Sequence, residues 1–408
     1  MALLDKKIAL SVSGMIFLFA LMVVVTQALF TSRFPGANDF YPRWRGAQIF
    51  FLEGIDPYSD VATEAIQRGM YGRLALPDED QVLFVYPFYT IFLLLPLVGL
   101  PYVWVQAIWL VTLQFALIAG VILSLRFLEW RTPTWLLSFT LLWTVIFYSS
   151  ARTVILGQFA GLVFLWIAAS LLALKHGQDV LAAVLLAFTT IKPQMSFLLI
   201  PALLLWGIGQ RRWRFVGSFV AAMAILAGLS FLLLPRWLAS FIEQVLYYPN
   251  YTEFGSPISI LTTHYFPQVG RSAEALLSLM VMLYLFYEWR HLPKVTADSS
   301  KFLFIIALTL VVTNLVATRT GTTNYVMLYI PLLWGLKAAA ANRPRGNYFV
   351  ALFFVLSGIG TWVLFLATID GNAENPIMFL PLPIGLFIML LWGRNILQHE
   401  SRVVVSEA

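Results

Sequence analysis

An acid, a tyrosine and two arginines surround one proline near the start of the chain, in the stretch Asn-Asp-Phe-Tyr-Pro-Arg-Trp-Arg at residues 38–45. A carboxylate that reaches a hydroxyl group through a hydrogen bond can act as its general base. Arginine binds phosphate oxygens through two parallel hydrogen bonds. We therefore predict that Asp39 is a catalytic base and that Tyr41 and Arg43 contact a substrate. The alternative for Arg43 is that it belongs to the basic face of a surface helix.

Asp39 also has a structural interpretation, because aspartate is favoured at the cap of a helix. Proline suits the first turn, so a helix is expected to begin near Pro42 and to end at Gly54. The cap of that helix would be Tyr41, which weakens the interpretation of Asp39 as a cap. Residues 61–72 are expected to form a second short helix, and we expect both helices to be amphipathic and to lie at a membrane surface.

The composition is that of an integral membrane protein. Of the 408 residues, 60% are hydrophobic and 11% are charged, and the mean hydropathy is +0.82, far above the range of soluble domains. The residue alternation of an outer-membrane barrel is missing, so we expect an all-α polytopic membrane protein that forms a single domain over residues 1–408. The net charge of +6 is spread over short loops, so nucleic acid is not an expected partner.

Neither a cofactor nor a metal ion is expected. The chain has no cysteine, which excludes disulfides and Cys-ligated zinc, haem and iron–sulfur sites. It also lacks a glycine-rich phosphate loop. Of the four histidines, only His264 is expected to face outward, where it is a candidate substrate contact. One histidine among scattered carboxylates does not predict a metal site.

The apolar runs set the topology. They lie at residues 8–30, 83–99, 103–125, 133–148, 159–174, 180–191, 195–208, 215–234, 273–289, 302–317, 325–336, 348–368 and 377–392. Lys6 and Lys7 place the chain start in the cytoplasm, and the basic residues of the later loops also belong there. If all thirteen runs crossed the membrane, the chain start and the later basic loops could not all lie in the cytoplasm. One early run is therefore expected not to cross.

The run at residues 83–99 is the best candidate, because it contains Pro87 and Pro96 and proline breaks helices. We predict that this segment stays in the outer leaflet and that about twelve helices span the membrane, with both termini cytoplasmic. The first extracytoplasmic loop is then residues 31–82, and the second is residues 235–272.

The run at residues 180–191 forms a short helix, whose length of about 18 Å falls below the roughly 30 Å hydrocarbon core. Lys192 follows it and is expected at the floor of a recess in the outer leaflet. Arg152 and Arg319 are also expected on the outer side, against the usual charge bias. We predict that these three cations bind the phosphate group of a lipid substrate. For the two arginines, contact with lipid headgroups is an equally favoured alternative.

The stretch that begins at Asn38 continues to residue 58 as N-D-F-Y-P-R-W-R-G-A-Q-I-F-F-L-E-G-I-D-P-Y. Three later stretches accompany it. They are F-V-Y-P-F at residues 84–88, L-G-Q-F-A-G-L at 156–162 and A-F-T-T-I-K-P-Q at 187–194. Together they resemble glycosyltransferase family 87, the polyprenyl-phosphate-sugar-dependent mannosyl- and arabinosyltransferases of the GT-C superfamily.

The resemblance implies a GT-C-like bundle with its active site at the extracytoplasmic face of the cell (inner) membrane. A sugar linked to polyprenyl phosphate would be transferred, with inversion, to a glycolipid, glycan or protein acceptor. Asp39 matches the acid of the family's first loop and would be the base. Lys192 matches its Lys-Pro pair and would hold the donor phosphate, while Arg152 falls by position in the loop that lines the donor site.

Three further positions are candidate substrate contacts. Tyr86 and Gln158 lie within the resembling stretches, although a helix-packing hydrogen bond is the alternative for Gln158. Asn324 stands where family members often carry a histidine, and G-S-P-I-S at residues 255–259 stands where an Asn-Gln-Ser element is common.

These two departures keep open a second function, that of a non-catalytic membrane subunit acting with a partner in a membrane complex. A third function, transport of a lipid-linked substrate, would require paired broken helices and repeated halves. The sequence has one short helix and no repeat, so transport is less favoured.

Overall fold

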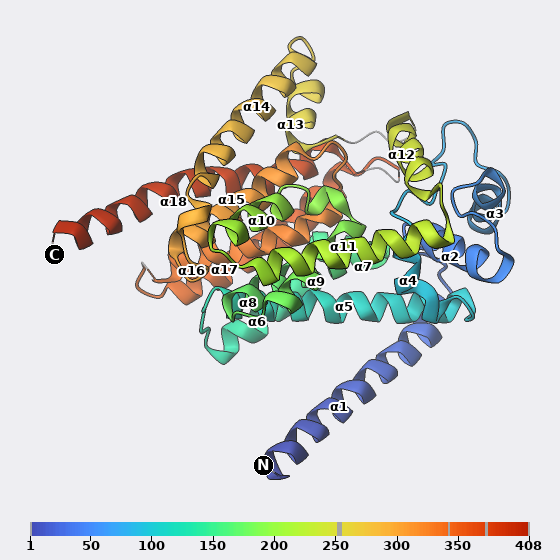
Figure 1. The fold of residues 1–408 in the computed structure, drawn as a ribbon, viewed down its shortest axis with the longest axis horizontal. Coiled ribbons are helices and arrows are strands. Elements are labelled where there is room, and N and C mark those ends of the chain that lie inside the picture. The colour runs from blue at the N-terminus through green and yellow to red at the C-terminus, as the bar shows by residue number, and fades with distance from the viewer. Residues whose placement is uncertain (1, 251–254, 342, 372–373, 407–408) are drawn as a thin grey trace.

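The protein is all-α, as its composition predicts. The computed structural model describes residues 2–250, 255–341, 343–371 and 374–406, and these residues form helices but no β-strand. Figure 1 shows most of the helices gathered in one bundle, with a few helices inclined to the rest.

Within the described residues, five segments are long and apolar enough to cross a membrane. One combines α1 (Ala2–Thr26) with η1 (Gln27–Thr31), and another combines η9 (Pro376–Phe379) with α18 (Pro381–Ser406). The other three are α5 (Tyr102–Phe127), α11 (Trp213–Leu233) and α17 (Gly346–Thr368). A sixth is formed if α6 (Thr134–Ile146) and α7 (Tyr148–Ile155), which meet at a bend of 49°, count as one span.

The remaining predicted spans coincide with helices α8 (Ala160–Lys175), α9 (Asp179–Phe188), α10 (Leu199–Gly209), α14 (Gly270–Trp289), α15 (Ser300–Val316) and α16 (Tyr329–Ala341). Several of these are short: α9 has 10 residues and is therefore only about 15 Å long. The polytopic fold is confirmed, whereas the number of about twelve crossings stays a prediction.

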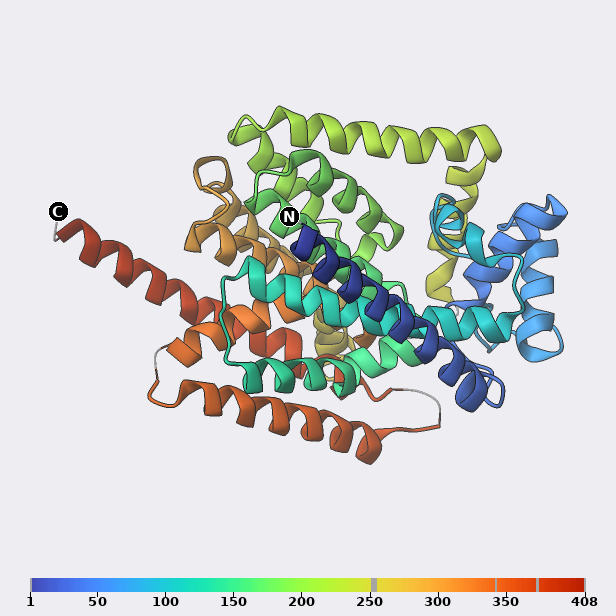
Figure 2. The same ribbon diagram turned by 90° about the horizontal axis from the view of Figure 1, so that it is seen from below.

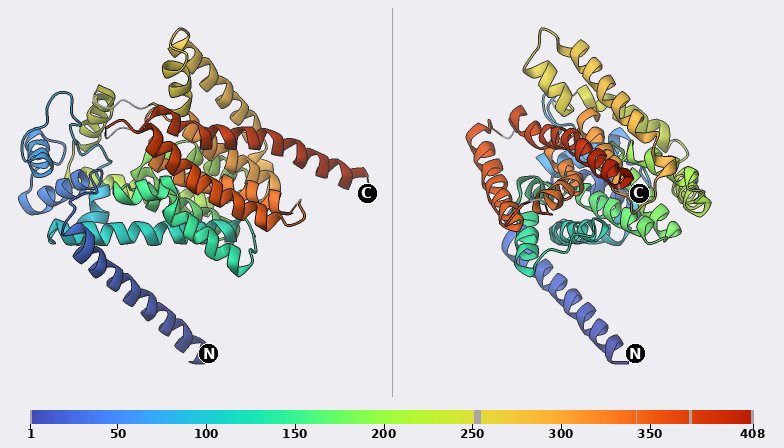
Figure 3. Two further views of the ribbon diagram at one scale, coloured as in Figure 1. Left: turned by 180° about the vertical axis from the view of Figure 1, so that it is seen from behind. Right: turned by 90° about the vertical axis from the view of Figure 1, so that its left-hand side faces the viewer.

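The bundle is built around α8, which packs between α5 and α9, while α9 packs in turn against α11. Figure 2 shows α11 and α17 along opposite edges of the bundle. Figure 3 shows α1 and the end of α18 extending away from it. Helices α2, α3, α4 and α12 lie together at one end of the bundle (Figure 1).

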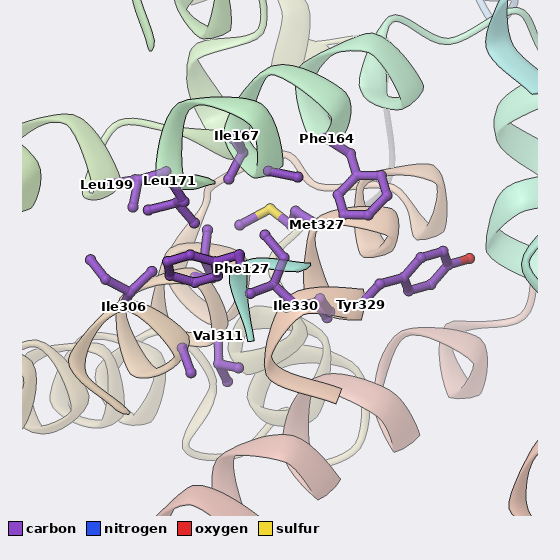
Figure 4. Packing of buried hydrophobic residues seen from close by; sticks show 14 of the residues in the cluster. Phe127, Phe164, Ile167, Leu171, Leu199, Ile306, Val311, Met327, Tyr329 and Ile330 are labelled. Carbon is purple, nitrogen blue, oxygen red and sulfur yellow. The ribbon is translucent and has the colours of Figure 1, made fainter. Parts of the chain in front are cut away.

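The largest buried cluster includes the place where α8 and α15 pack against the 3-10 segment η8 (Thr322–Leu328). Phe164 of α8 faces Met327 and Tyr329 (Figure 4). Gly120 of α5 permits this packing, because a Cβ at that position would lie 2.5 Å from the Phe164 ring. Side chains from these helices fill the centre at interior density and fix the helix ends that carry polar residues. The labelled members are Phe127, Phe164, Ile167, Leu171, Leu199, Ile306, Val311, Met327, Tyr329 and Ile330.

The first loop folds as the sequence predicts. The helix expected near Pro42 is α2 (Tyr41–Glu53), which ends at Gly54 with φ of +69°. The second helix is α3 (Asp60–Tyr71), capped by the side chain of Ser59. One face of α2 packs on protein, since Trp44 Nε1 donates a hydrogen bond to Leu97 O at 3.0 Å. Helix α2 is therefore anchored to the bundle.

The segment at residues 83–99 forms only α4 (Thr90–Leu94) and the 3-10 turn η2 (Leu95–Leu97). Neither element alone is long enough to cross a bilayer. That the segment does not span the membrane and lies in the outer leaflet stays a prediction.

Two predicted outer loops contain helices. Most of the loop expected at residues 149–158 is helix α7, and four of its eight residues are buried. The second outer loop contains α12 (Trp237–Tyr247), α13 (Pro257–Ser259) and η6 (Ile260–His264). Residues 251–254 of that loop lie outside the described residues. The polar composition of α7 suggested a loop, but burial of half of its residues in the tertiary structure stabilises helical structure there.

Candidate active site

Asp39 is held by the backbone that follows α7. Its N–H donates a hydrogen bond to Leu156 O at 3.1 Å, and the N–H of Ala37 donates to Ile155 O at 3.2 Å. The residue at the cap of α2 is Phe40, and no side-chain hydrogen bond caps this helix. The interpretation of Asp39 as a helix cap is therefore wrong.

Gly157 allows the first loop to approach this backbone closely. Its φ is +70°, and a Cβ there would lie 2.7 Å from Phe40 Cβ and 2.8 Å from Ala37 Cβ. Its carbonyl oxygen accepts a hydrogen bond of 2.7 Å from Trp109 Nε1, which is buried. A left-handed residue with no room for a Cβ must be glycine, and this glycine places Gln158 beside Asp39.

Asp39 and Lys192 are joined through one side chain. Gln158 Nε2 donates a hydrogen bond of 2.5 Å to Asp39 Oδ2, and Lys192 Nζ donates one of 2.5 Å to Gln158 Oε1. An ionised carboxylate only accepts hydrogen bonds and an ammonium group only donates them. The amide of Gln158 therefore has only one orientation that satisfies both partners, and the acid and the cation share one site.

Lys192 occupies a turn between η3 (Thr189–Ile191) and η4 (Pro193–Met195), at the end of the short helix α9. Its side chain is buried, with 3% of its surface exposed. Burial lowers the pKa of Lys192 to about 7, although the negative charge of Asp39 opposes the change. The ammonium form is thus easily lost unless an anion lies nearby.

Arg43 supplies a second cation to the same place. Its guanidinium carbon lies 4.6 Å from the centre of the Tyr86 ring, and Tyr86 packs in turn against Phe159 at 5.2 Å. Arg43 Nε is buried and has no hydrogen-bond partner among the described residues. The positive charge of Arg43 also contributes to the low pKa of Lys192. Two cations thus face one carboxylate, and a bound anion would balance the site.

Arg152 belongs to a different cluster. Its Nε lies 3.4 Å from Glu374 Oε1, and the same oxygen accepts hydrogen bonds from Thr322 Oγ1 at 2.6 Å and from the Tyr148 hydroxyl. Glu374 is 7% exposed. This buried carboxylate fixes the segment just before η9 to α7, and Arg152 already has an anionic partner.

Two other candidates make contacts of their own. Arg319 donates a hydrogen bond of 3.1 Å to Pro249 O and lies near Tyr248. Asn324 is buried and donates to Thr320 Oγ1 at 3.1 Å. Its packing is that of a core residue.

Tyr41 and His264 each contact a neighbouring aromatic ring. The Tyr41 ring packs edge-on against Tyr102 at 4.8 Å. His264 is exposed at the end of η6 and contacts the neighbouring Tyr265 ring at 4.9 Å. A substrate role for these two residues stays a prediction.

A cavity of about 410 Å³ lies elsewhere, at the starts of α6 and α17, where Trp135, Arg343 and Arg345 line it. None of the residues around Asp39 lines this cavity. Asp39 is the candidate centre, because a carboxylate, a buried amine and a guanidinium group converge there.

Two residues that join separate segments of the chain could not be found from the sequence. Glu374 is an isolated acid in a late loop. Gln244 of α12 accepts a hydrogen bond from the Val85 N–H at 2.9 Å and donates one to Tyr58 O at 3.2 Å. It thereby joins the second outer loop to the first. Neither residue lies in a motif, so no local signal marks them.

Comparison with known proteins supplies the family. Neither a curated protein nor a solved structure matches the chain. Residues 84–314 match the model of glycosyltransferase family 87, and these residues are more than half of the 408. The matched region includes Tyr86, Gln158 and Lys192 and begins after Asp39. The chain therefore belongs to glycosyltransferase family 87, and it is an integral membrane glycosyltransferase.

Proposed function

We propose that the protein transfers a sugar from a polyprenyl-phosphate donor to a hydroxyl group of an acceptor, at the extracytoplasmic face of the cell membrane. The family supports sugar transfer by a membrane protein. The proposed mechanism rests on the hydrogen bonds that link Asp39 through Gln158 to Lys192. They hold a carboxylate that can act as a base close to a buried cation, and displacement of a phosphate leaving group requires both groups.

In this reaction Asp39 removes the proton of the acceptor hydroxyl group. The acceptor oxygen then attacks the anomeric carbon from the side opposite the phosphate, so the configuration inverts. The bond between that carbon and the phosphate oxygen breaks, and its electron pair stays on the polyprenyl phosphate. Asp39 ends with the proton and releases it to water.

Lys192 stabilises the charge that grows on the leaving phosphate. We propose Arg43 as the second phosphate contact, because its Nε has no partner among the described residues and its charge reaches Lys192. Arg152 is less suited to this role, since the donor would have to displace Glu374 from it. Preorganised donors aimed at developing charge are commonly the largest single contribution to catalysis.

The test uses the full-length protein purified in lipid nanodiscs. Labelled polyprenyl-phosphate-mannose and polyprenyl-phosphate-arabinofuranose are each incubated with a membrane extract. We expect label to move to one fraction, and separating glycolipid, glycan and protein fractions identifies the acceptor. No transfer from either donor, together with stable association in a larger complex, would instead support the non-catalytic subunit.

A further inference from the structure

The cavity of about 410 Å³ at the starts of α6 and α17 has the lining of a binding site. Each helix contributes one aromatic residue to it, and the rings of Trp135 and Tyr348 stack with their centres 5.4 Å apart. Arg343 and Arg345, from the turn before α17, line the same cavity. A volume of this order accommodates a small molecule or a headgroup. Two guanidinium groups and an aromatic wall therefore face one space.

The turn that carries the two arginines has a fixed shape. The N–H of Gly346 donates a hydrogen bond to Arg343 O at 3.0 Å, and the N–H of Tyr348 donates one to Arg345 O at 2.9 Å. A Cβ at Gly346 would lie 2.1 Å from Ala340 O, so the turn packs directly on the end of α16. Arg345 has a φ of +62°, which residues other than glycine seldom adopt. Such strained residues cluster where a chain presents groups to a ligand.

The two cations have no acid to neutralise them. Among the described residues, neither Arg343 nor Arg345 lies within ion-pair distance of a carboxylate. Glu129, in the turn before α6, is paired with Lys175 at 3.0 Å. The guanidinium carbon of Arg343 lies 4.3 Å from the centre of the Phe349 ring. A guanidinium group that stacks on a ring keeps its in-plane N–H groups free for an anion.

The cavity and Asp39 lie at opposite ends of one helical segment. Helices α6 and α17 run side by side (Figure 2). Trp135 meets Tyr348 at their starts, and Trp362 Nε1 donates a hydrogen bond of 2.8 Å to Ile146 O near the end of α6. Helix α7 then leads to the backbone that holds Asp39.

This segment has the length of a membrane crossing. The 13 residues of α6 and the 8 residues of α7 make about 30 Å of helix along their bent axis, which is about the thickness of the hydrocarbon core. With the Asp39 site on the outer side, as proposed above, the cavity opens at the level of the cytoplasmic headgroups.

We propose that this cavity binds the phosphate group of an anionic phospholipid of the cytoplasmic leaflet. Arg343 and Arg345 would hold the phosphate oxygens, for which the guanidinium fork is suited. Trp135 and Tyr348 would lie against the glycerol part, since their rings favour the membrane interface. Basic pockets between helices on the cytoplasmic side are typical sites for anionic headgroups. The binding itself does not depend on sugar transfer.

The test titrates the full-length protein, purified in detergent, with phosphatidylglycerol and counts bound lipids by native mass spectrometry. Phosphatidylcholine, whose headgroup has no net charge, is the comparison lipid. The double variant Arg343→Gln/Arg345→Gln is compared with the control Arg211→Gln/Arg214→Gln. The control also removes two exposed arginines at a helix start, and Arg211 likewise has a positive φ, +55°. Arg343→Gln alone leaves the left-handed position unchanged and guards against a folding defect.

We expect the wild type to bind its first phosphatidylglycerol more tightly than phosphatidylcholine. The cavity double variant should raise the dissociation constant for phosphatidylglycerol about 25-fold, and Arg343→Gln alone about fivefold, because each basic residue near a membrane surface contributes about a fivefold change. The control pair should change it by less than about twofold.

Equal weakening in the two double variants would mean that phosphatidylglycerol is held only by diffuse attraction, and this result would overturn the inference. An unchanged dissociation constant in the cavity variants would overturn it as well. A last arm adds soluble glycerol phosphate as a competitor. We expect it not to displace the lipid at the lipid's own concentration, whereas displacement there would assign the cavity to a soluble phosphate compound. None of these results depends on the role of Asp39, so the proposed function is tested separately.

Discussion

The carboxylate of Asp39 and the ammonium group of Lys192 bind opposite ends of the same amide, that of Gln158. The acid comes from the turn before α2 and the lysine from the turn after α9. A base and a leaving-group contact held by one side chain keep a fixed separation, and catalysis depends on such positioning.

Gln158→Met should lower kcat by about 10- to 100-fold, a part of what general base catalysis contributes, because Asp39 loses its orientation. Gln158→Glu supplies a sharper test. A protonated glutamic acid can donate to Asp39 and accept from Lys192, whereas the ionised form repels Asp39. We therefore expect Gln158→Glu to regain activity as the pH falls. Equal loss of activity at every pH would contradict the positioning role.

Donor binding should weaken as the pH rises through about 7. The pKa of Lys192 is lowered to about 7, so the charged form that attracts phosphate is present below this pH and is lost above it. The donor dissociation constant should rise by at most about tenfold per pH unit, since one proton is involved. Lys192→Arg keeps its charge over this range and should remove the dependence. An unchanged slope in Lys192→Arg would show that another group titrates.

Gly157→Ala should destabilise the protein more than Gly177→Ala does. Both glycines have positive φ, +70° and +72°, but only at Gly157 would a Cβ meet neighbouring atoms. The backbone strain common to both variants costs about 1–3 kcal/mol, and the contact with Ala37 and Phe40 adds to it at Gly157 alone. Thermal unfolding followed by tryptophan fluorescence measures the difference. Equal melting temperatures would mean that the first loop is not held at this point.

Glu374→Gln should lower stability by about 1–3 kcal/mol, because Arg152 and Thr322 lose a charged partner. The donor dissociation constant should change by less than about threefold, within the effect of a weak surface interaction. Both are measurable on the same nanodisc preparation. A large loss of donor affinity in Glu374→Gln, with unchanged stability, would assign the Arg152 cluster to substrate binding instead.

Much of the fold was predictable from periodicity and charge. The apolar runs coincide with helices, and α2 and α3 form where Pro42, Gly54 and Gly72 indicate. Helix α7 was not predicted, because its polar composition favours a loop and only its burial in the tertiary structure makes it helical.

The site was predictable in part. Asp39 and Lys192 stood out as polar residues in apolar surroundings, and topology alone placed them on one side. Gln158 was ambiguous, because a glutamine in a helical bundle usually only packs. Glu374, which belongs to the separate Arg152 cluster, could not be found, since it is an isolated acid. Its surroundings depend on loops that meet only in the folded chain.

Sugar transfer by Asp39→Asn is the most direct measurement of the proposed mechanism. Asparagine can still accept the Gln158 hydrogen bond, so the site keeps its shape while the base is lost. We expect donor binding to stay within about threefold and kcat to fall by about 100-fold or more, while the exposed control Asp60→Asn stays near wild type. A folded Asp39→Asn variant that transfers sugar at the wild-type rate would contradict the proposed role of Asp39 as the base.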